Sequence, residues 1–394
     1  MRRNISLIHI LQPGSTKVRS FGRTRPKNFY SIEIKYQQLF SASPVYLRKK
    51  ILVKVFYKSI ALPFQYPFTI SGGRTKTHQP SLIVALQLGN YTGYGEAPAI
   101  TYYNITVEQM TDDLEKKKSF VEKFAFTEPE RYWHYLHHLF PKNPFLVCAL
   151  DMAAWDLYGK MKAAPLHTLW NTKWNNDVIT DYTIGIDSIE KMTEKIKEKP
   201  WPVYKIKVGT ADDVAMLQQL RKHTDATFRV DANAAWTLDE ALQKIPLLKE
   251  LGVELAEQPL AKDNLEGMKV LYEQSPLPLF ADESCVFEND VEKCHQHFHG
   301  INIKLTKCSG ITPALRMIQK AKSLGMKVMM GCMNECTVGS AAIAQFLPQL
   351  DYADMDGPLL LSEDIATGIN YDNGKVVISN AAGLGIQLKS DFTW

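Results

Sequence analysis

The most regular feature of the chain is an alternation of short apolar runs with longer amphipathic segments, from about residue 180 onward. Each run begins with β-branched or other apolar residues and ends in a polar residue, and these polar ends recur every 22 to 28 positions. A strand, a loop, a three-turn helix and a second loop need about this length. The eight runs lie at 181–186, 203–208, 227–232, 253–258, 278–283, 301–305, 327–332 and 351–356.

Eight strand–helix units predict an α/β fold, with a modified (β/α)₈ TIM barrel over residues 166–365. The main rival is a doubly wound open sheet, but no glycine-rich fingerprint follows the first run. Amphipathic segments at 211–223, 237–252 and 311–325 predict helices between the strands. In the last of these, we expect Thr312 to cap the helix, Pro313 to start it and Gly325 to close it.

The residues before the barrel follow a different pattern, which predicts a separate α+β capping domain over 51–165. A strand-like run at 53–62 precedes two runs joined by Gly89-Asn90, a hairpin signal. Helical patterns follow at 106–124 and 146–163. After the barrel, a second hairpin is expected to turn at Asn373-Gly374, in a C-terminal segment (366–394) that returns to the capping domain.

Positive charge is concentrated in the first fifty residues, which hold eleven Lys/Arg and one acidic residue. This composition predicts a basic, disordered extension or a targeting segment. The remaining residues carry 35 basic and 41 acidic side chains, a net charge of −6, which argues against nucleic acid as a partner. No apolar run approaches the roughly 18 residues that span a bilayer, so no membrane association is expected.

The six cysteines show neither a CxxC pair nor the spacing of a metal finger. Reduced thiols and a cytoplasmic location are therefore expected. The sequence leaves the oligomeric state open, a homo-oligomer included.

Three carboxylates stand at the ends of consecutive predicted strands: Asp231, Glu257 and Asp282. The carboxyl ends of barrel strands meet in one mouth, where unpaired carboxylates would repel one another. A hard divalent cation relieves this repulsion, and all-oxygen ligation favours Mg²⁺, with Mn²⁺ as the alternative. The competing interpretation is that each acid caps a helix or forms an ion pair at its own strand–helix junction.

Basic side chains occupy the ends of the second and sixth predicted strands. Lys205 and Lys207 lie two apart and so point to the same face, while Lys304 stands on the opposite side of an eight-stranded barrel. A lysine on each side therefore faces the predicted metal. On the eighth strand, Asp354 and Asp356 suit a cationic ligand such as an ammonium group, although capping or a turn also explains them.

Taken together, the motifs at these strand ends resemble those of the enolase superfamily. Within its muconate-lactonizing subgroup, the chain is similar to the dipeptide epimerases of the L-Ala-D/L-Glu epimerase kind, over about residues 51–390. The resemblance rests on KIKVG (205–209), VDANAAW (230–236), EQP (257–259), ADES (281–284), NIKLTKCSG (302–310), GCM (331–333) and ADMDGPL (353–359).

The resemblance implies a role for each residue of the site. One Mg²⁺ per subunit would be bound by three carboxylates with an amide in support: Asp231, Glu257, Asp282 and Asn233. Lys207 and Lys304 would be the acid and base, a lysine base with Mg²⁺ being usual for this superfamily. Lys205 would help to hold the substrate carboxylate and favour the neutral amine of Lys207.

The resemblance also implies how a dipeptide is held. Asp354 and Asp356 would bind its α-ammonium group, and Arg74 would pair with the side chain of a C-terminal Glu. Further implied substrate contacts are Thr183, Cys332 and Asn334.

The implied reaction is epimerisation of the C-terminal residue of a dipeptide by 1,1-proton transfer, with L-Ala-D/L-Glu from peptidoglycan recycling as the expected substrate. One alternative is an epimerase for other, hydrophobic dipeptides. Another is muconate cycloisomerase or o-succinylbenzoate synthase, which share the lysines and metal but need no ammonium-binding acid pair. A metal-dependent binding protein on a degenerate barrel is the alternative from a different class.

Overall fold

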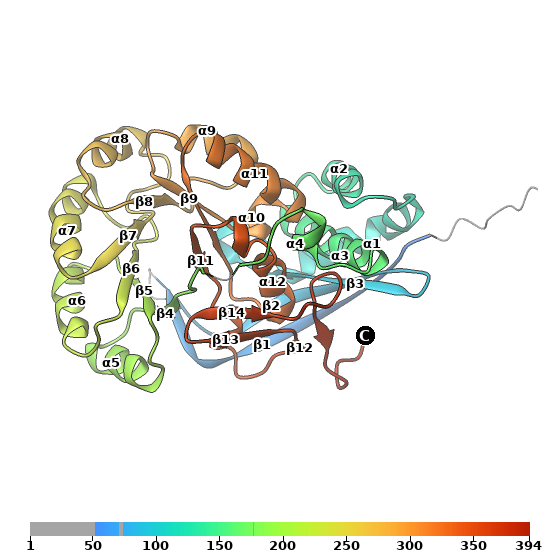
Figure 1. The fold of residues 1–394 in the computed structure, drawn as a ribbon, viewed down its shortest axis with the longest axis horizontal. Helices are drawn as coiled ribbons and strands as arrows, with labels where there is room; N and C mark the ends of the chain where they lie inside the picture. The colour runs from blue at the N-terminus through green and yellow to red at the C-terminus, as the bar shows by residue number, and fades with distance from the viewer. Residues whose placement is uncertain (1–51, 71–73, 176) are drawn as a thin grey trace, which may run out of the picture. The chain divides into compact units, whose positions relative to one another are not determined.

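We describe the protein from a computed structural model, which covers residues 52–70, 74–175 and 177–394. The predicted basic extension at 1–50 lies outside these residues. The described part begins with an antiparallel sheet in the order β1-β2-β3 (Figure 1). Its strands are β1 (Lys54–Ile70), β2 (Arg74–Leu88) and β3 (Tyr91–Pro98). The predicted hairpin at Gly89-Asn90 is confirmed, and Gly89 takes the positive φ of 61° that its turn requires.

Two helices pack against this sheet, α1 (Val107–Lys123) and α3 (Pro144–Met161), and α2 (Pro129–Leu139) packs on α3. Thr106 begins α1 with a capping box, because its hydroxyl accepts from Gln109 N while Gln109 accepts from Thr106 N. Helix α3 lies so close to β3 that a Cβ at Gly95 would stand 2.0 Å from Ala149 O. The buried residues of sheet and helices form a hydrophobic core of their own.

The predicted barrel is confirmed. Its eight parallel strands follow the chain order from β4 to β11, and an isolated bridge between Thr180 and Ala353 nearly closes the sheet. The strands are β4 (Tyr182–Ile184), β5 (Val203–Lys207), β6 (Thr227–Asp231), β7 (Val253–Glu257), β8 (Leu279–Ala281), β9 (Gly300–Ile303), β10 (Lys327–Gly331) and β11 (Tyr352–Asp354). The register sets Lys207 beside Asp231 and Asp231 beside Glu257, which brings three predicted site residues together.

Helices α5 to α9 lie on the outer side of strands β4 to β8 (Figure 1). The helices of the barrel region are α4 (Leu166–Leu169), α5 (Ile189–Glu198), α6 (Asp213–Arg221), α7 (Leu238–Glu250), α8 (Leu265–Gln274), α9 (Glu288–Cys294), α10 (Leu305–Cys308), α11 (Ile311–Ser323) and α12 (Thr337–Ala344). Within the described residues, no helix combines the length and apolar character that crossing a bilayer requires.

The start of α11 differs from the prediction. The helix begins at Ile311 after Gly310, so Thr312 and Pro313 lie inside its first turn. Thr312 does not cap the helix, because its N–H and its hydroxyl both donate to Asp151 on α3, at 2.9 and 2.8 Å. Thr312 therefore bonds to the distant Asp151 and not to the N–H groups of its own helix. Gly325 closes the helix as predicted, with φ 72°.

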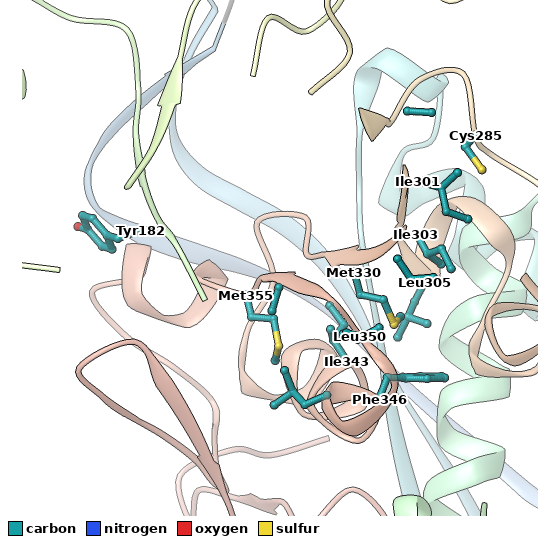
Figure 2. Packing of buried hydrophobic residues seen from close by; sticks show 14 of the residues in the cluster. Tyr182, Cys285, Ile301, Ile303, Leu305, Met330, Ile343, Phe346, Leu350 and Met355 are labelled. Atoms are coloured by element: carbon teal, nitrogen blue, oxygen red, sulfur yellow. The ribbon is translucent and has the colours of Figure 1, made fainter. Parts of the chain in front are cut away.

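The main hydrophobic core fills the space between the barrel strands and their helices. Figure 2 shows part of it, where Met330 of β10 points toward Ile343 of α12 and toward Phe346. Every residue of α12 is buried. A helix that is apolar all round has no exposed polar face, so its sequence lacked the amphipathic period by which the other helices were predicted.

The C-terminal segment makes two kinds of contact. Its hairpin, β13 (Ile369–Asp372) and β14 (Lys375–Ile378), turns at Asn373-Gly374 and lies beside the barrel start, where Thr180 N donates to Gly374 O at 2.9 Å. The two-residue strands β12 (Ala366–Thr367) and β15 (Gln387–Leu388) pair with each other. The last residues reach the first sheet, where Trp394 stacks on Tyr94 with ring centroids 6.2 Å apart.

Candidate active site

The carboxyl ends of the barrel strands open into a cavity of about 230 Å³. One wall comes from the barrel and the other from residues 100–103, which include the 3₁₀ helix η1 (Thr101–Tyr103). Most of the site residues predicted from the sequence line this cavity: Thr183, Lys205, Lys207, Asp282, Lys304, Cys332, Asn334, Asp354 and Asp356.

Asp231 and Glu257 lie beneath these lining residues and are fully buried. The ammonium group of Lys205 lies between them, 3.1 Å from Asp231 Oδ2 and 2.8 Å from Glu257 Oε2. Burial alone would lower the pKa of Lys205, but Asp354, Glu257 and Asp231 outweigh it and raise this pKa well above its ordinary value. Lys205 is therefore a fixed positive charge at the floor of the cavity.

The two lysines predicted as acid and base lie on strands four positions apart in an eight-stranded sheet. Lys207 ends β5 and contacts Asp231 Oδ2 at 2.6 Å and Asn233 Oδ1 at 3.3 Å. Lys304 follows β9 and contacts Asp282 Oδ2 at 2.9 Å. Opposite strands of such a sheet face each other across the barrel. The cavity therefore has a lysine on each of two opposing sides.

Lys304 is held charged by its carboxylate partner. Burial acts to lower the pKa of Lys304, but Asp282 and Glu257 raise it well above its ordinary value. In the same contact, burial acts to raise the pKa of Asp282, while Lys304 and Lys307 hold it below its ordinary range. A cation that took over Asp282 would therefore release Lys304 for proton transfer.

The structure also brings in a residue that sequence reasoning missed. The ammonium of Lys307 is 1% exposed and contacts Asp282 Oδ1 at 2.5 Å. The sequence did carry a signal for this residue: in the motif NIKLTKCSG, Lys307 follows Lys304 by three positions, which places both on the same side of a helical turn.

A second acidic cluster lies at the end of β11. Cys332 Sγ and one oxygen each of Asp354 and Asp356 lie within 4.8 Å of one another. Asp356 Oδ2 accepts from the backbone N–H of Thr183 at 2.6 Å. Burial and the neighbouring Asp354 raise the pKa of Asp356 to about 6. The neutral thiol is a poor ligand for hard cations, so this cluster suits an organic ammonium better than Mg²⁺.

The charges of the strand ends do not balance within the barrel. Buried carboxylates gather there: Asp231, Glu257, Asp282, Glu283, Glu335, Asp354 and Asp356. Four lysine ammonium groups accompany them: Lys205, Lys207, Lys304 and Lys307. Burial and Asp231 also raise the pKa of Glu257, a sign of crowded negative charge. A divalent cation would offset this excess of carboxylates over ammonium groups, and the carboxylate oxygens of Asp231, Glu257 and Asp282 are ligands of the type that Mg²⁺ prefers.

Arg74 was predicted to contact the side chain of the C-terminal residue of the dipeptide, and the structure locates only its backbone. Arg74 opens β2, but its side chain lies outside the described residues. Lys76, on the same strand, lines the cavity together with Tyr102 and Tyr103. The sequence did not indicate these three residues, because an alternating strand pattern does not tell which loop of one domain approaches another.

Known proteins share both the sequence and the fold. Residues 187–392 match the family model described as enolase C-terminal domain-like. The chain is 50% identical over 336 residues to a Flavobacterium johnsoniae protein named L-Ala-D/L-amino acid epimerase, and the match covers 85% of this chain and 100% of that protein.

Two solved structures have the same fold over almost their whole length. The substrate-liganded complex of the L-Ala-D/L-Glu epimerase from Bacillus subtilis matches with a TM-score of 0.80 and 30% identity, over 85% of this chain and 98% of that chain. The dipeptide epimerase from Cytophaga hutchinsonii, complexed with Mg and the dipeptide D-Ala-L-Val, matches with a TM-score of 0.80 and 26% identity, over 87% and 97%.

Proposed function

This chain belongs to the enolase superfamily, among its dipeptide epimerases, and from that premise we propose that it epimerises the C-terminal residue of dipeptides by moving a proton between Lys207 and Lys304. One observation carries the proposal: the two lysines stand at the ends of strands on opposite sides of the barrel and line one cavity, beside buried carboxylates.

The proposed metal is Mg²⁺, the ion present in the Cytophaga hutchinsonii complex. In this chain Asp231, Glu257 and Asp282 would hold it, with Asn233 in support. When bound, Mg²⁺ stabilises the negative charge that develops on the substrate carboxylate as the α-proton leaves. Lys205, a permanent cation beside two of these ligands, would attract the same carboxylate.

The two lysines divide the proton transfer between them. For one epimer, the neutral amine of Lys207 takes the α-proton from one face, and the ammonium of Lys304 gives a proton to the other face. For the opposite epimer the roles are exchanged. Inversion at the α-carbon therefore needs one neutral and one charged lysine, on opposite sides of the same carbon.

The acid pair of β11 would hold the other end of the substrate. Asp354 and Asp356 present buried carboxylates in the same cavity as the lysines of β5, and Asp354 Oδ2 contacts the Lys205 ammonium at 2.7 Å. Two carboxylates without a metal of their own attract the α-ammonium group of a dipeptide. An ammonium bound here and a carboxylate at the floor would fix the substrate at both ends.

We propose L-Ala-D/L-Glu, a peptidoglycan dipeptide, as the substrate. The support is a cation at the capping wall, Lys76, and the neighbouring Arg74 of the sequence, both suited to an acidic C-terminal side chain. A cytoplasmic location is proposed as well, because all six cysteines are unpaired in the described part of the chain.

Isotope exchange tests the reaction directly. The purified protein is incubated with Mg²⁺ and a library of dipeptides in D₂O, and the mass of each dipeptide is measured by mass spectrometry. We expect a gain of one mass unit at the α-carbon of the C-terminal residue, largest for L-Ala-L-Glu and L-Ala-D-Glu. If no dipeptide gains deuterium, the proposed function is wrong.

The ammonium site gives a separate prediction. Asp356→Asn should lower kcat/KM for L-Ala-L-Glu by roughly 30-fold or more, since removing one charge of a buried pair costs about 2–5 kcal/mol. The asparagine keeps the shape and the acceptor for Thr183 N–H. The measurement is the rate of α-deuterium uptake at several dipeptide concentrations.

N-acetyl-L-Ala-L-Glu is the matched control, because it lacks the ammonium group. We expect this compound to be a poor substrate for the unaltered protein and to react no slower with Asp356→Asn. An equal loss on both compounds would mean that Asp356 only holds Thr183 in place. Unchanged turnover of L-Ala-L-Glu would instead show that Asp356 does not bind the ammonium group.

A further inference from the structure

Lys307 lies in the short helix α10 and is the most deeply buried lysine at the strand ends. Besides the carboxylate of Asp282, its ammonium donates to three backbone carbonyls. These belong to Asp282 at 2.6 Å, Cys285 at 3.0 Å and Asn302 at 3.4 Å. An ammonium group has three protons for these four acceptors, so at least one N–H is shared between two oxygens and none is left for a substrate.

The carboxylate of Asp282 is divided between two lysines of the same segment. Its Oδ1 is contacted by Lys307 and its Oδ2 by Lys304. Lys304 lines the cavity and Lys307 does not. Lys307 instead lines a neighbouring pocket with Glu283 and Ser284, so Oδ2, which contacts Lys304, is the oxygen on the active-site side.

The loop that carries Asp282 is also held from its other side. Gln258 Oε1 accepts from the backbone N–H groups of Asp282 and Ser284, at 3.0 and 3.1 Å. Lys307 takes the carbonyls of the same loop while Gln258 takes its N–H groups. Between them, these two side chains fix both the backbone and the side-chain rotation of Asp282.

We propose that Lys307 is a positioning residue of the magnesium site, which locks Asp282 Oδ1 so that Oδ2 is the oxygen offered to the cation. The contact with Lys307 would also keep the Asp282 carboxylate from rotating when a bound cation replaces Lys304 at Oδ2. The inference rests on the proposed metal site, and it concerns the affinity for the ion rather than proton transfer.

The direction in which Mg²⁺ affinity changes when Lys307 is replaced separates a positioning role from a purely electrostatic one. A positive charge beside a cation site repels the cation, so if charge alone mattered, neutralising Lys307 would tighten Mg²⁺ binding. If Lys307 holds a ligand in position, losing it weakens binding. Loss of such an outer contact to a metal ligand commonly costs about 10- to 100-fold in affinity.

The test is isothermal titration of Mg²⁺ into full-length protein stripped with EDTA, using Lys307→Met and Lys307→Gln. We expect Lys307→Met to bind Mg²⁺ about 10- to 100-fold more weakly than the unaltered protein. Lys307→Gln, which keeps one amide donor, should fall between the two. If Lys307→Met does not fold, as judged by circular dichroism, the Mg²⁺ affinity of Lys307→Gln alone is the test: weaker binding supports the positioning role, and unchanged or tighter binding contradicts it.

Lys244→Met is the matched control. Lys244 is also buried and bonded to a carboxylate, Asp213, at 2.9 Å, with a further bond to Thr210 O at 2.7 Å. It contacts none of the proposed ligands, so its variant should lose stability but keep its Mg²⁺ affinity. Unchanged or tighter binding in both Lys307 variants would overturn the inference. No binding to the unaltered protein would instead overturn the proposed metal site.

Discussion

Replacing Lys207 with alanine should abolish epimerisation and still leave α-proton exchange with one of the two epimers. Lys304 alone can remove a proton from the face it touches and return a deuteron to that same face, but it cannot reach the other face. A general acid or base contributes about 10²- to 10⁴-fold, so the loss of epimerisation should be at least of this size. The measurement is α-deuterium uptake from D₂O by each epimer separately, together with the optical rotation of the product.

Lys304→Ala is the mirror control for this experiment. It should also abolish epimerisation, but the epimer that still exchanges should be the opposite one. This mirror relation follows from the two lysines lying on opposite sides of the cavity. Exchange of both epimers in one variant would contradict the assignment, because then a single group would serve both faces.

The barrel was predictable because its strands and the polar residues at their carboxyl ends recur with the same spacing along the chain. Residues at the carboxyl end of each strand, such as Lys207, Asp231 and Glu257, differ in sequence number by about one strand–helix unit. Parallel register then sets them side by side, as the pairs Lys207–Asp231 and Asp231–Glu257 show. Spacing two apart on a strand likewise placed Lys205 and Lys207 on one face.

Features set by contacts between distant segments could not be read from such a period. Thr312 has the local sequence of a helix cap, yet Asp151, 161 residues away, binds it instead. The sequence places Lys307 one helical turn after Lys304, but it does not show that a carboxylate and three carbonyls surround it. The wall made by Tyr102 and Tyr103 depends on how the capping segment meets the barrel.

Dependence on Mg²⁺ follows from the charges themselves. The strand ends gather more carboxylates than ammonium groups, and in the described structure the lysines pair with carboxylates that the reaction would need free. In this arrangement Lys304 is held charged by Asp282 and Glu257. The cation would thus have two effects: it neutralises the carboxylates, and it frees the lysines to exchange protons.

Removing the metal with EDTA should therefore reduce epimerisation by about 10³-fold or more. Stabilising the developing charge is worth several kcal/mol, and each ~1.4 kcal/mol is tenfold in rate. Adding back Mg²⁺ or Mn²⁺ should restore the rate. The ion should also raise the free energy of unfolding, by about 2.7 kcal/mol when its concentration is a hundredfold above its dissociation constant. Urea unfolding with and without Mg²⁺ measures this second effect.

Glu257→Gln separates a specific site from a general salt effect. Glu257 is fully buried, and its carboxylate bonds to Lys205 and Asn302 among the described residues, so its amide replacement removes one proposed charged ligand without exposing the floor. In this variant the Mg²⁺-dependent gain in unfolding free energy should fall sharply, because the ion keeps two of three carboxylates. A gain of the same size in the variant, or full activity of the EDTA-treated protein, would show that these carboxylates are balanced without a bound ion.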